Sequence, residues 1–267
     1  MPWYTPVASP PSLDRILACS WTAAPSGTHR LVPDACTDLL WISTGSIVLC
    51  GPETTAWDFA LPAGTTSVGV RFRPGKGPHV FGVDASTIRD RRVPLSRLVD
   101  QAVAQRLSQL LQDLSGPAQR MHALEHFVAE RTADTTGEPD DFVDRVLDHL
   151  AASPRAGAGS LAAHLGMTTR QLHRRALASF GYGTSTLARL LRFQRFLAIT
   201  DASATGRPAL ARLAAEAGYS DQAHLARDCR RICGTTPTDF LAGYFATFPD
   251  MSDPYKTAAP LLATMGA

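Results

Sequence analysis

The sequence predicts an α+β protein with a β-rich N-terminal part and an all-α C-terminal part. Three observations predict it: short apolar runs between turn residues before residue 95, apolar residues at helical spacing after it, and no large apolar residue in 132–140. Of the 267 residues, 45% are hydrophobic, which is enough to fill hydrophobic cores. We therefore expect two domains, a linker between them and a poorly ordered tail, at 1–131, 141–246, 132–140 and 247–267 respectively.

The β-rich part is dense in Gly, Pro and Thr over residues 30–95. Apolar runs at 39–42, 46–50 and 67–72 predict strands, because turn signals such as Ser43-Thr44-Gly45 stand between them. Short strands at this spacing favour a small antiparallel barrel or sandwich.

A helical hairpin is expected next. Apolar residues recur at helical spacing from Pro94 to Leu114, where Ser115-Gly116-Pro117 would end the helix, and a second helix is expected over about 118–131. Such a hairpin packs within its own domain or forms a dimer surface.

The formal charge of +2 hides an asymmetry along the chain. Residues 1–139 have a net charge of −1, whereas residues 160–235 hold eleven arginines, no lysine and four acids, a net charge of +7. Such an excess can attract a phosphate backbone, or it can be a solvated helical surface. Charge alone does not decide between the two.

The helical part contains an internal repeat. Leu161-Ala-Ala-His-Leu-Gly166 is followed by Leu172 and Gly181, and Leu213-Ala-Ala-Glu-Ala-Gly218 is followed by Leu225 and Gly234. Each copy predicts a short Ala-rich helix, a tight glycine turn, a polar N-cap and a second, basic helix. This is the pattern of a helix-turn-helix, whose second helix enters the major groove N-terminus first.

A continuous helix is expected between the copies, from Ser185 to Thr200, with Leu187, Leu190, Leu191 and Leu197 as its packing residues. At 1.5 Å per residue it would span about 24 Å. That length could hold two recognition helices near the ~34 Å separation of successive major grooves.

The segment Gly218-Tyr-Ser-Asp-Gln-Ala-His-Leu-Ala-Arg227, continuing through Gly234-Thr-Thr-Pro237, resembles the second helix-turn-helix of AraC/XylS transcription regulators. The first unit is also similar, at Leu172-His-Arg-Arg175 and Phe180-Gly-Tyr-Gly183, although Thr184-Ser185 replaces the expected Pro-Lys. This resemblance covers about 142–245. The N-terminal part, at 32–41 and 69–75, is similar to AraC-type sensor domains. Together, the two resemblances imply a small cupin-like β-barrel with a helical hairpin, followed by two helix-turn-helix units joined by a linker helix.

The resemblance places base-reading positions on two recognition helices, at about Thr169–Phe180 and Ser220–Cys233. Arginine can form two hydrogen bonds to guanine, and glutamine can do the same with adenine. Alanine offers only a methyl group, which can contact the methyl group of thymine. The DNA-binding positions implied are Thr169, Arg170, His173, Arg174, Ser220, Gln222, Ala223, His224 and Arg227. Four more arginines are interpreted as phosphate contacts or packing-face salt bridges: Arg175, Arg192, Arg195 and Arg230. Ser220 and Asp221 are equally good helix caps, and the exposed histidines could be plain surface.

The resulting hypothesis is a sequence-specific transcription regulator that binds double-stranded DNA and responds to a small-molecule effector. RNA polymerase would be a further partner of an activator, and homodimerisation stays open. Effector-binding candidates in the strand region are His29, Trp41, Trp57, Phe59 and Arg71, although an apolar barrel core explains the aromatic residues equally well.

Other classes of function find less support. No phosphate loop or nucleophile elbow is present, so we expect no enzyme, cofactor or metal site. No signal peptide or membrane-length apolar run is seen, and five scattered cysteines predict a reduced, cytoplasmic protein. The alternative is a ligand- or metal-binding barrel or a cysteine redox sensor. It would use His122, His126 and Glu130 on one helix face, or Cys229 and Cys233 one turn apart.

Overall fold

The computed structural model describes residues 3–25, 27–133, 141–202 and 209–247. The expected linker and tail lie almost entirely outside these ranges. Within them, no helix is both long enough and apolar enough to cross a membrane.

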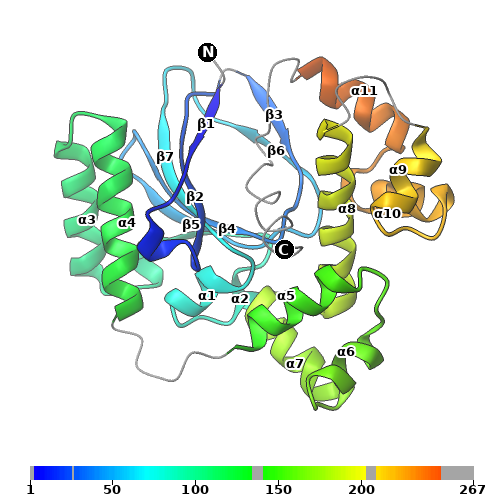
Figure 1. Cartoon of the computed structure of the whole chain (residues 1–267). Coiled ribbons are helices and arrows are strands. Elements are labelled where there is room, and N and C mark those ends of the chain that lie inside the picture. The colour runs from blue at the N-terminus through cyan, green and yellow to red at the C-terminus, as the bar shows by residue number, and fades with distance from the viewer. Residues whose placement is uncertain (1–2, 26, 134–140, 203–208, 248–267) are drawn as a thin grey trace.

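The strands of the N-terminal part form two antiparallel sheets (Figure 1). The larger has the order β1-β2-β7-β4-β5-β8, and the smaller pairs β3 with β6. Their bounds are Tyr4–Val7 (β1), Leu17–Ala23 (β2), Thr28–Leu31 (β3), Thr37–Ile42 (β4), Ile47–Cys50 (β5), Trp57–Ala60 (β6), Ser67–Phe72 (β7) and Arg92–Pro94 (β8). The α+β class is thereby confirmed, and the pairings of the described strands make two sheets rather than one continuous ring.

The two faces of the larger sheet have different neighbours. One face buries Leu39, Trp41 and Val70 in a core shared with the helical hairpin of α3 (Gln101–Asp113) and α4 (Pro117–Ala133). Because side chains alternate along a strand, Asp38, Leu40 and Arg71 lie on the opposite face, toward β3 and β6.

The hairpin begins later than its apolar spacing suggests. Residues 92–94 form β8 and Leu95–Arg97 form a 3-10 turn, so the expected helical start at Pro94 is wrong. The helix α3 begins at Gln101, because the Asp100 side chain accepts a hydrogen bond of 2.8 Å from the Ala102 N–H and caps its first turn.

The described residues of the C-terminal part form helices joined by turns, with no strand among them. Two short helices before it, α1 (Lys76–Val80) and α2 (Ala85–Ile88), belong to the N-terminal part and face it (Figure 1). Its own helices are Phe142–Ala152 (α5), Ala158–His164 (α6), Thr169–Phe180 (α7), Thr184–Ala202 (α8), Leu210–Glu216 (α9), Gln222–Cys233 (α10) and Pro237–Thr247 (α11). The pairs α6–α7 and α9–α10 are the two predicted helix-turn-helix units, with Gly166 and Gly218 at positive φ in their turns.

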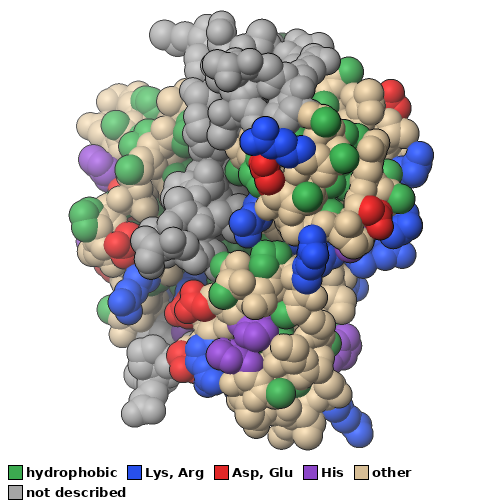
Figure 2. All heavy atoms as spheres, turned by 45° about the vertical axis from the view of Figure 1, so that its right-hand side comes forward, with side chains coloured by type: hydrophobic (Ala, Val, Ile, Leu, Met, Phe, Trp, Pro, Cys, Tyr) green, Lys and Arg blue, Asp and Glu red, His purple; other side chains and the backbone are tan. Residues whose placement is uncertain are grey.

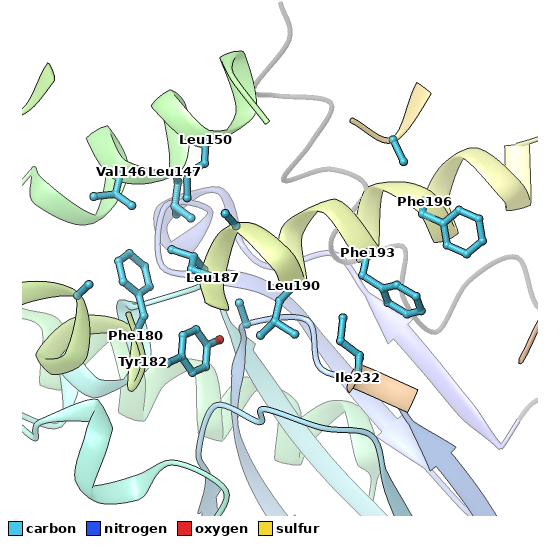
Figure 3. Close-up of a cluster of buried hydrophobic side chains, with 14 of the residues drawn as sticks. Val146, Leu147, Leu150, Phe180, Tyr182, Leu187, Leu190, Phe193, Phe196 and Ile232 are labelled. Atoms are coloured by element: carbon cyan, nitrogen blue, oxygen red, sulfur yellow. The ribbon is translucent and has the colours of Figure 1, made fainter. Parts of the chain in front are cut away.

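The linker helix α8 is the centre of this core. Leu187 lies near Leu147 of α5 and Phe180 of α7, while Leu190, Phe193 and Phe196 continue the core along the helix (Figure 3). These five aromatic and leucine side chains of α7 and α8 are at most 1% exposed: Phe180, Leu187, Leu190, Phe193 and Phe196. The same core includes Val32, Ala35 and Ala56 from the N-terminal part, so the two parts share buried apolar contacts.

Candidate nucleic-acid interface and ligand cavity

The first candidate reading helix, α7, has defined ends. Thr168 and Gln171 form a capping box at its start, and Gly181 closes it in the left-handed conformation with φ of 81°. Leu172, Ala176 and Phe180 are buried and fix the rotation of the helix. The structure leaves the predicted reading positions exposed: Thr169, Arg170, His173 and Arg174.

The second candidate recognition helix, α10, begins at Gln222, two residues later than expected, because Asp221 is its N-cap. The Asp221 carboxylate accepts a 2.6 Å hydrogen bond from the His224 N–H, and this bond lowers the pKa of Asp221. Gln222, Ala223 and Arg227 are exposed, as is Ser220 just before the helix.

His224 is a less open position than its neighbours on α10. It is half-buried, lies edge-on to the Tyr219 ring at 5.1 Å between centroids, and its Nδ1 is 3.2 Å from the Ser220 hydroxyl. Its Nε2 is 3.7 Å from Asp228. Both His224 and Ser220 therefore make contacts within the second helix-turn-helix unit, in addition to any contact with DNA.

The four arginines proposed for phosphate or packing divide in two. Arg192 donates to the Pro154 carbonyl at 3.0 Å and pairs with Asp228, and Arg175 lies 4.2 Å above the Phe142 ring, so both serve packing. Arg230 is exposed and Arg195 half-buried, so they keep side-chain surface for phosphates. Basic side chains are scattered over the helical side of the molecule (Figure 2).

A cavity lies between the two sheets of the N-terminal part. The space in it that the centre of a water molecule can reach has a volume of about 90 Å³. Of the effector candidates, the structure brings Trp57, Phe59 and Arg71 to its lining. Trp41 lies in the core on the opposite face of the sheet, and His29 is stacked on Trp3 at 4.0 Å behind the lining.

Several lining residues were not predicted. Trp3 stands just before β1, Tyr4 and Trp21 belong to β1 and β2, and Asp34, Asp38 and Glu53 bring carboxylates. The alternation of apolar and polar residues in 17–23 could have revealed β2, and with it the direction of Trp21.

Arg71 is held at the base of the cavity by two carboxylates. Its Nη1 is 3.1 Å from Asp34, its Nε is 3.0 Å from Asp38, and the Trp21 indole donates to Asp38 at 2.8 Å. Burial raises the pKa of Asp38, although Arg71 opposes this. Arg71 is thus already paired with two acids, and this group has one more carboxylate than it has cations.

The cysteines are poor candidates for thiolate chemistry. Burial raises the pKa of Cys19 to about 11 and that of Cys50 to about 12, and it raises the pKa of Cys36 as well. The contact with Cys229, together with burial, raises the pKa of Cys233. The structure therefore offers little support for the redox alternative.

The metal alternative also gains no support. His126 and Glu130 form a 3.6 Å contact at a solvated surface. Across the described ranges, no group of three or more His, Cys, Asp or Glu side chains is arranged to hold a metal ion.

Glu53 is a titratable group at the cavity wall. It pairs with Arg92, whose guanidinium lies 3.7 Å above the Trp57 ring. Burial raises the pKa of Glu53 to about 7, although Arg92 opposes this.

We expect the stability of the fold to fall as the pH rises from about 4.5 to 7. In this window the unfolded chain releases the Glu53 proton while the folded chain retains it, so deprotonation favours unfolding. Urea denaturation at several pH values should show a smaller fall in the Glu53→Gln variant than in the wild type. An equal fall in both would contradict the assignment, and Glu130→Gln at an exposed position is the control.

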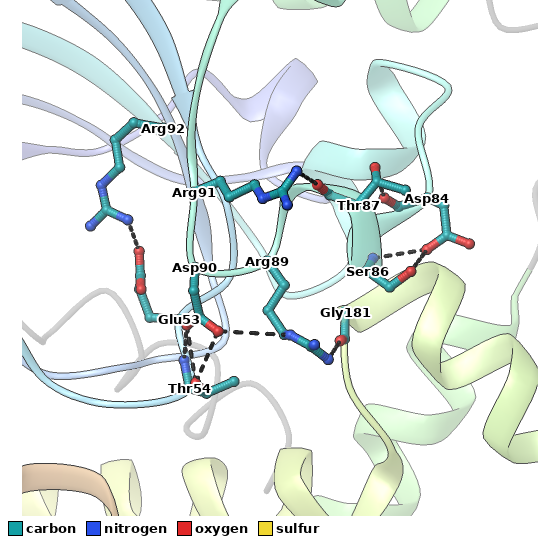
Figure 4. Close-up of polar contacts among 10 residues, drawn as sticks. All are labelled: Glu53, Thr54, Asp84, Ser86, Thr87, Arg89, Asp90, Arg91, Arg92 and Gly181. Atoms are coloured by element: carbon teal, nitrogen blue, oxygen red, sulfur yellow. Dashed lines mark hydrogen bonds and ion pairs between the residues drawn. The ribbon is translucent and has the colours of Figure 1, made fainter.

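Hydrogen bonds connect the cavity walls to the reading helices. Glu53 is adjacent to Thr54, which binds Asp90, and the neighbouring Arg89 donates to the Gly181 carbonyl at the end of α7 at 2.8 Å (Figure 4). On a second wall, the Pro33 carbonyl accepts a 2.8 Å bond from Gln194 of α8.

A third connection reaches the second reading helix. The Ala56 N–H donates to the Ile232 carbonyl of α10 at 2.7 Å. The two segments that supply these contacts, 31–36 and 51–57, also line the cavity. A change in cavity occupancy would therefore act on segments that touch α7, α8 and α10.

Two family models match the chain. Residues 161–243 match a helix-turn-helix domain, and residues 6–94 match a domain of unknown function (DUF6597). The first match covers both predicted units and confirms the resemblance of the C-terminal part to AraC-type DNA-binding domains. None of the curated proteins matches the chain.

Among solved structures, ToxT from Vibrio cholerae O395 is similar to this chain, with a TM-score of 0.45, 10% sequence identity, and coverage of 90% of this chain and 97% of ToxT. The structure of the same protein bound to (E)-4-(8-methylnaphthalen-1-yl)but-3-enoic acid has a TM-score of 0.46 and 10% sequence identity, and the match covers 90% of this chain and 99% of ToxT. The structure of ToxT from V. cholerae strain SCE256 with a bound unsaturated fatty acid has a TM-score of 0.41 and 12% sequence identity, and the match covers 80% of this chain and 93% of ToxT.

Proposed function

We propose that this chain, whose C-terminal part is an AraC-type helix-turn-helix domain, is a sequence-specific transcription regulator modulated by a small-molecule effector. The observation that carries the proposal is the pair of helices α7 and α10, each capped at its N-terminus and each with exposed Arg, His or Gln side chains in its first turns. A recognition helix enters the major groove with its N-terminal residues. In α7 and α10 the exposed polar side chains lie at this N-terminal end.

The length of the linker helix supports readout of two grooves. The linker helix α8 has 19 residues, which gives a length of about 28 Å at 1.5 Å per residue. The separation of successive major grooves on one side of DNA is about 34 Å. Arg170, His173 and Arg174 would read one half-element, and Gln222, Ala223 and Arg227 the other, with Arg195 and Arg230 on phosphates.

The same proposal divides the chain into a sensor or dimerisation domain at 1–131, a linker at 132–140, a DNA-binding domain at 141–246 and a tail at 247–267. It includes no catalytic step and places the protein in the cytoplasm, with its DNA. RNA polymerase would be a partner of an activator, and homodimerisation would join two reading domains.

Selection of bound sequences from random duplex DNA, at two salt concentrations, tests the function. We expect a motif with two half-elements about one helical turn apart and binding that weakens steeply with salt. A single short element would mean that one unit reads bases. Absence of binding even at low salt would overturn the proposal.

Arg227→Ala should cost about 1–3 kcal/mol on the selected site and relax the preference at one base position, because it removes a base contact. Arg230→Ala is the matched variant on the same helix. It should weaken binding to all sequences alike and reduce the salt dependence by about one phosphate contact. If Arg227→Ala weakened all sequences equally, Arg227 would be a phosphate contact instead.

A further inference from the structure

The cavity between the sheets has aromatic walls. Five rings line it, and they form a nearly continuous set with centroid separations of 5.5 Å for Tyr4–Trp21, 5.7 Å for Trp3–Tyr4, 6.1 Å for Trp3–Phe59 and 5.7 Å for Trp57–Phe59. Ring faces attract cations through their quadrupole. Two of these rings already have a guanidinium against them: Arg92 at 3.7 Å from the Trp57 centroid and Arg71 at 5.9 Å from that of Tyr4.

The charges around the cavity favour a cation as well. Three carboxylates reach the lining, those of Asp34, Asp38 and Glu53, whereas Arg71 is its one lining cation among the described residues. Even with Arg92, which pairs with Glu53 from beside the cavity, the acids are in excess by one once the pH exceeds the raised pKa of Glu53, about 7. A cation in the cavity would balance the charge that these side chains leave.

Arg71 is unavailable to an anionic ligand. Its Nε and Nη1 lie 3.0 Å and 3.1 Å from Asp38 and Asp34, so a carboxylate that approached it would also approach both of these acids. Like charges at such distances in a buried site repel strongly. The effect on the neighbouring thiols agrees: after burial, Asp34 contributes most to raising the pKa of Cys36, and Asp38 and Glu53 raise that of Cys50 against Arg92.

We propose that the cavity binds a small organic ammonium ion with an aromatic or apolar body, its charge directed to Asp34, Asp38 and Glu53 and its body to the Trp3, Trp21, Trp57 and Phe59 rings. This inference rests on the proposed function, since it names the chemical class of the effector. Asp34, Glu53 and Trp57 lie in the segments 31–36 and 51–57, which contact α7, α8 and α10, so the same ligand would act on the candidate recognition helices.

Three probes of matched shape test the charge preference: 3-phenylpropylammonium, 3-phenylpropanol and 3-phenylpropionate. Binding to the full chain is followed by intrinsic fluorescence, because three of the four tryptophans line the cavity, and by calorimetry. We expect the ammonium to bind at least tenfold more tightly than the alcohol, and the carboxylate to bind most weakly. Equal or tighter binding of either other probe, or no response to the ammonium at millimolar concentration, overturns the proposal.

A pair of variants locates the site. Above pH 7, where Glu53 is ionised, Glu53→Gln should weaken binding of the ammonium at least fivefold and leave that of the alcohol unchanged. Asp58→Asn is the matched control, because Asp58 is exposed on β6 between the cavity residues Trp57 and Phe59 and pairs with Arg30 instead. An equal loss in both variants would place the ammonium elsewhere and overturn the assignment.

DNA binding is measured on the same preparation without any probe. A chain that selects a DNA motif but shows no charge preference overturns the ammonium inference alone. A chain that prefers the ammonium but binds no DNA overturns the proposed function and leaves the cavity assignment standing.

Discussion

Replacing Gly181 with alanine should destabilise the protein by about 2 to 5 kcal/mol. Gly181 ends α7 with φ of 81°, a conformation that costs an L-residue roughly 1–2 kcal/mol. A Cβ there would also lie 2.9 Å from the Pro52 ring and 3.0 Å from the Ala85 carbonyl oxygen, both in the N-terminal part. Overpacking of this kind typically adds about 1–3 kcal/mol.

The second helix-turn-helix supplies the matched control. Gly234 ends α10 in the same conformation, with φ of 75°, and a Cβ there would meet nothing within 4 Å. Gly234→Ala should therefore lose only the backbone contribution of roughly 1–2 kcal/mol. Urea denaturation of both variants isolates the packing between the two parts as the difference. Equal losses would mean that Gly181 is not pressed against the N-terminal part.

The helical part was predictable because its signals are local. Within each unit, the turn glycine, the polar cap and the terminal glycine stand within about twenty residues, and each has a direct backbone consequence. The expected range of α7, Thr169–Phe180, is that of the structure. The start of α10 differs because a cap can be satisfied by Ser220 or by Asp221, and only the bond from the His224 N–H selects Asp221.

The cavity lining was predictable only in part, because the face of the sheet on which a side chain lies depends on strand register. A step of one residue moves a side chain to the other face of a sheet, so Trp41 enters the core under α4 while Leu40 faces the cavity. Trp21 was missed together with β2. The aromatic residues of the sequence therefore indicate which strands form the cavity. The alternation of side chains along each strand determines which of these residues line it.

The contacts between the two parts lay beyond sequence reasoning. The Gln194–Pro33 bond joins residues 161 positions apart, and the Arg89–Gly181 bond joins residues 92 positions apart. No local pattern marks either pair, because each side chain donates to a backbone carbonyl, a group that every residue has. The basic excess was equally ambiguous: Arg192 and Arg175 count toward it in the sequence but contact Asp228 and Phe142.

Asp228→Asn should destabilise the protein by about 3 to 5 kcal/mol. The Asp228 side chain is 10% exposed on α10 and pairs with Arg189 at 3.2 Å and Arg192 at 3.5 Å, both on α8. Removing the one acid leaves two partly buried guanidiniums side by side without compensation, which is the costly way to break a buried pair. Denaturation measurements check the loss, and a change below about 1 kcal/mol would contradict it.

A surface pair on the neighbouring helix provides the comparison. Glu216 pairs with Arg212 at 2.7 Å on α9, but the two side chains are 41% and 72% exposed, so Glu216→Gln should leave stability unchanged within error. The loss in Asp228→Asn should also become smaller when Arg189 is replaced by glutamine, because the double variant holds one uncompensated charge fewer. Since Asp228 fixes α10 to the linker helix, we expect DNA selection with Asp228→Asn to keep the half-element read by α7 and lose the one read by α10. Loss of both half-elements together would mean that Asp228 supports the whole domain rather than the placement of its second reading helix.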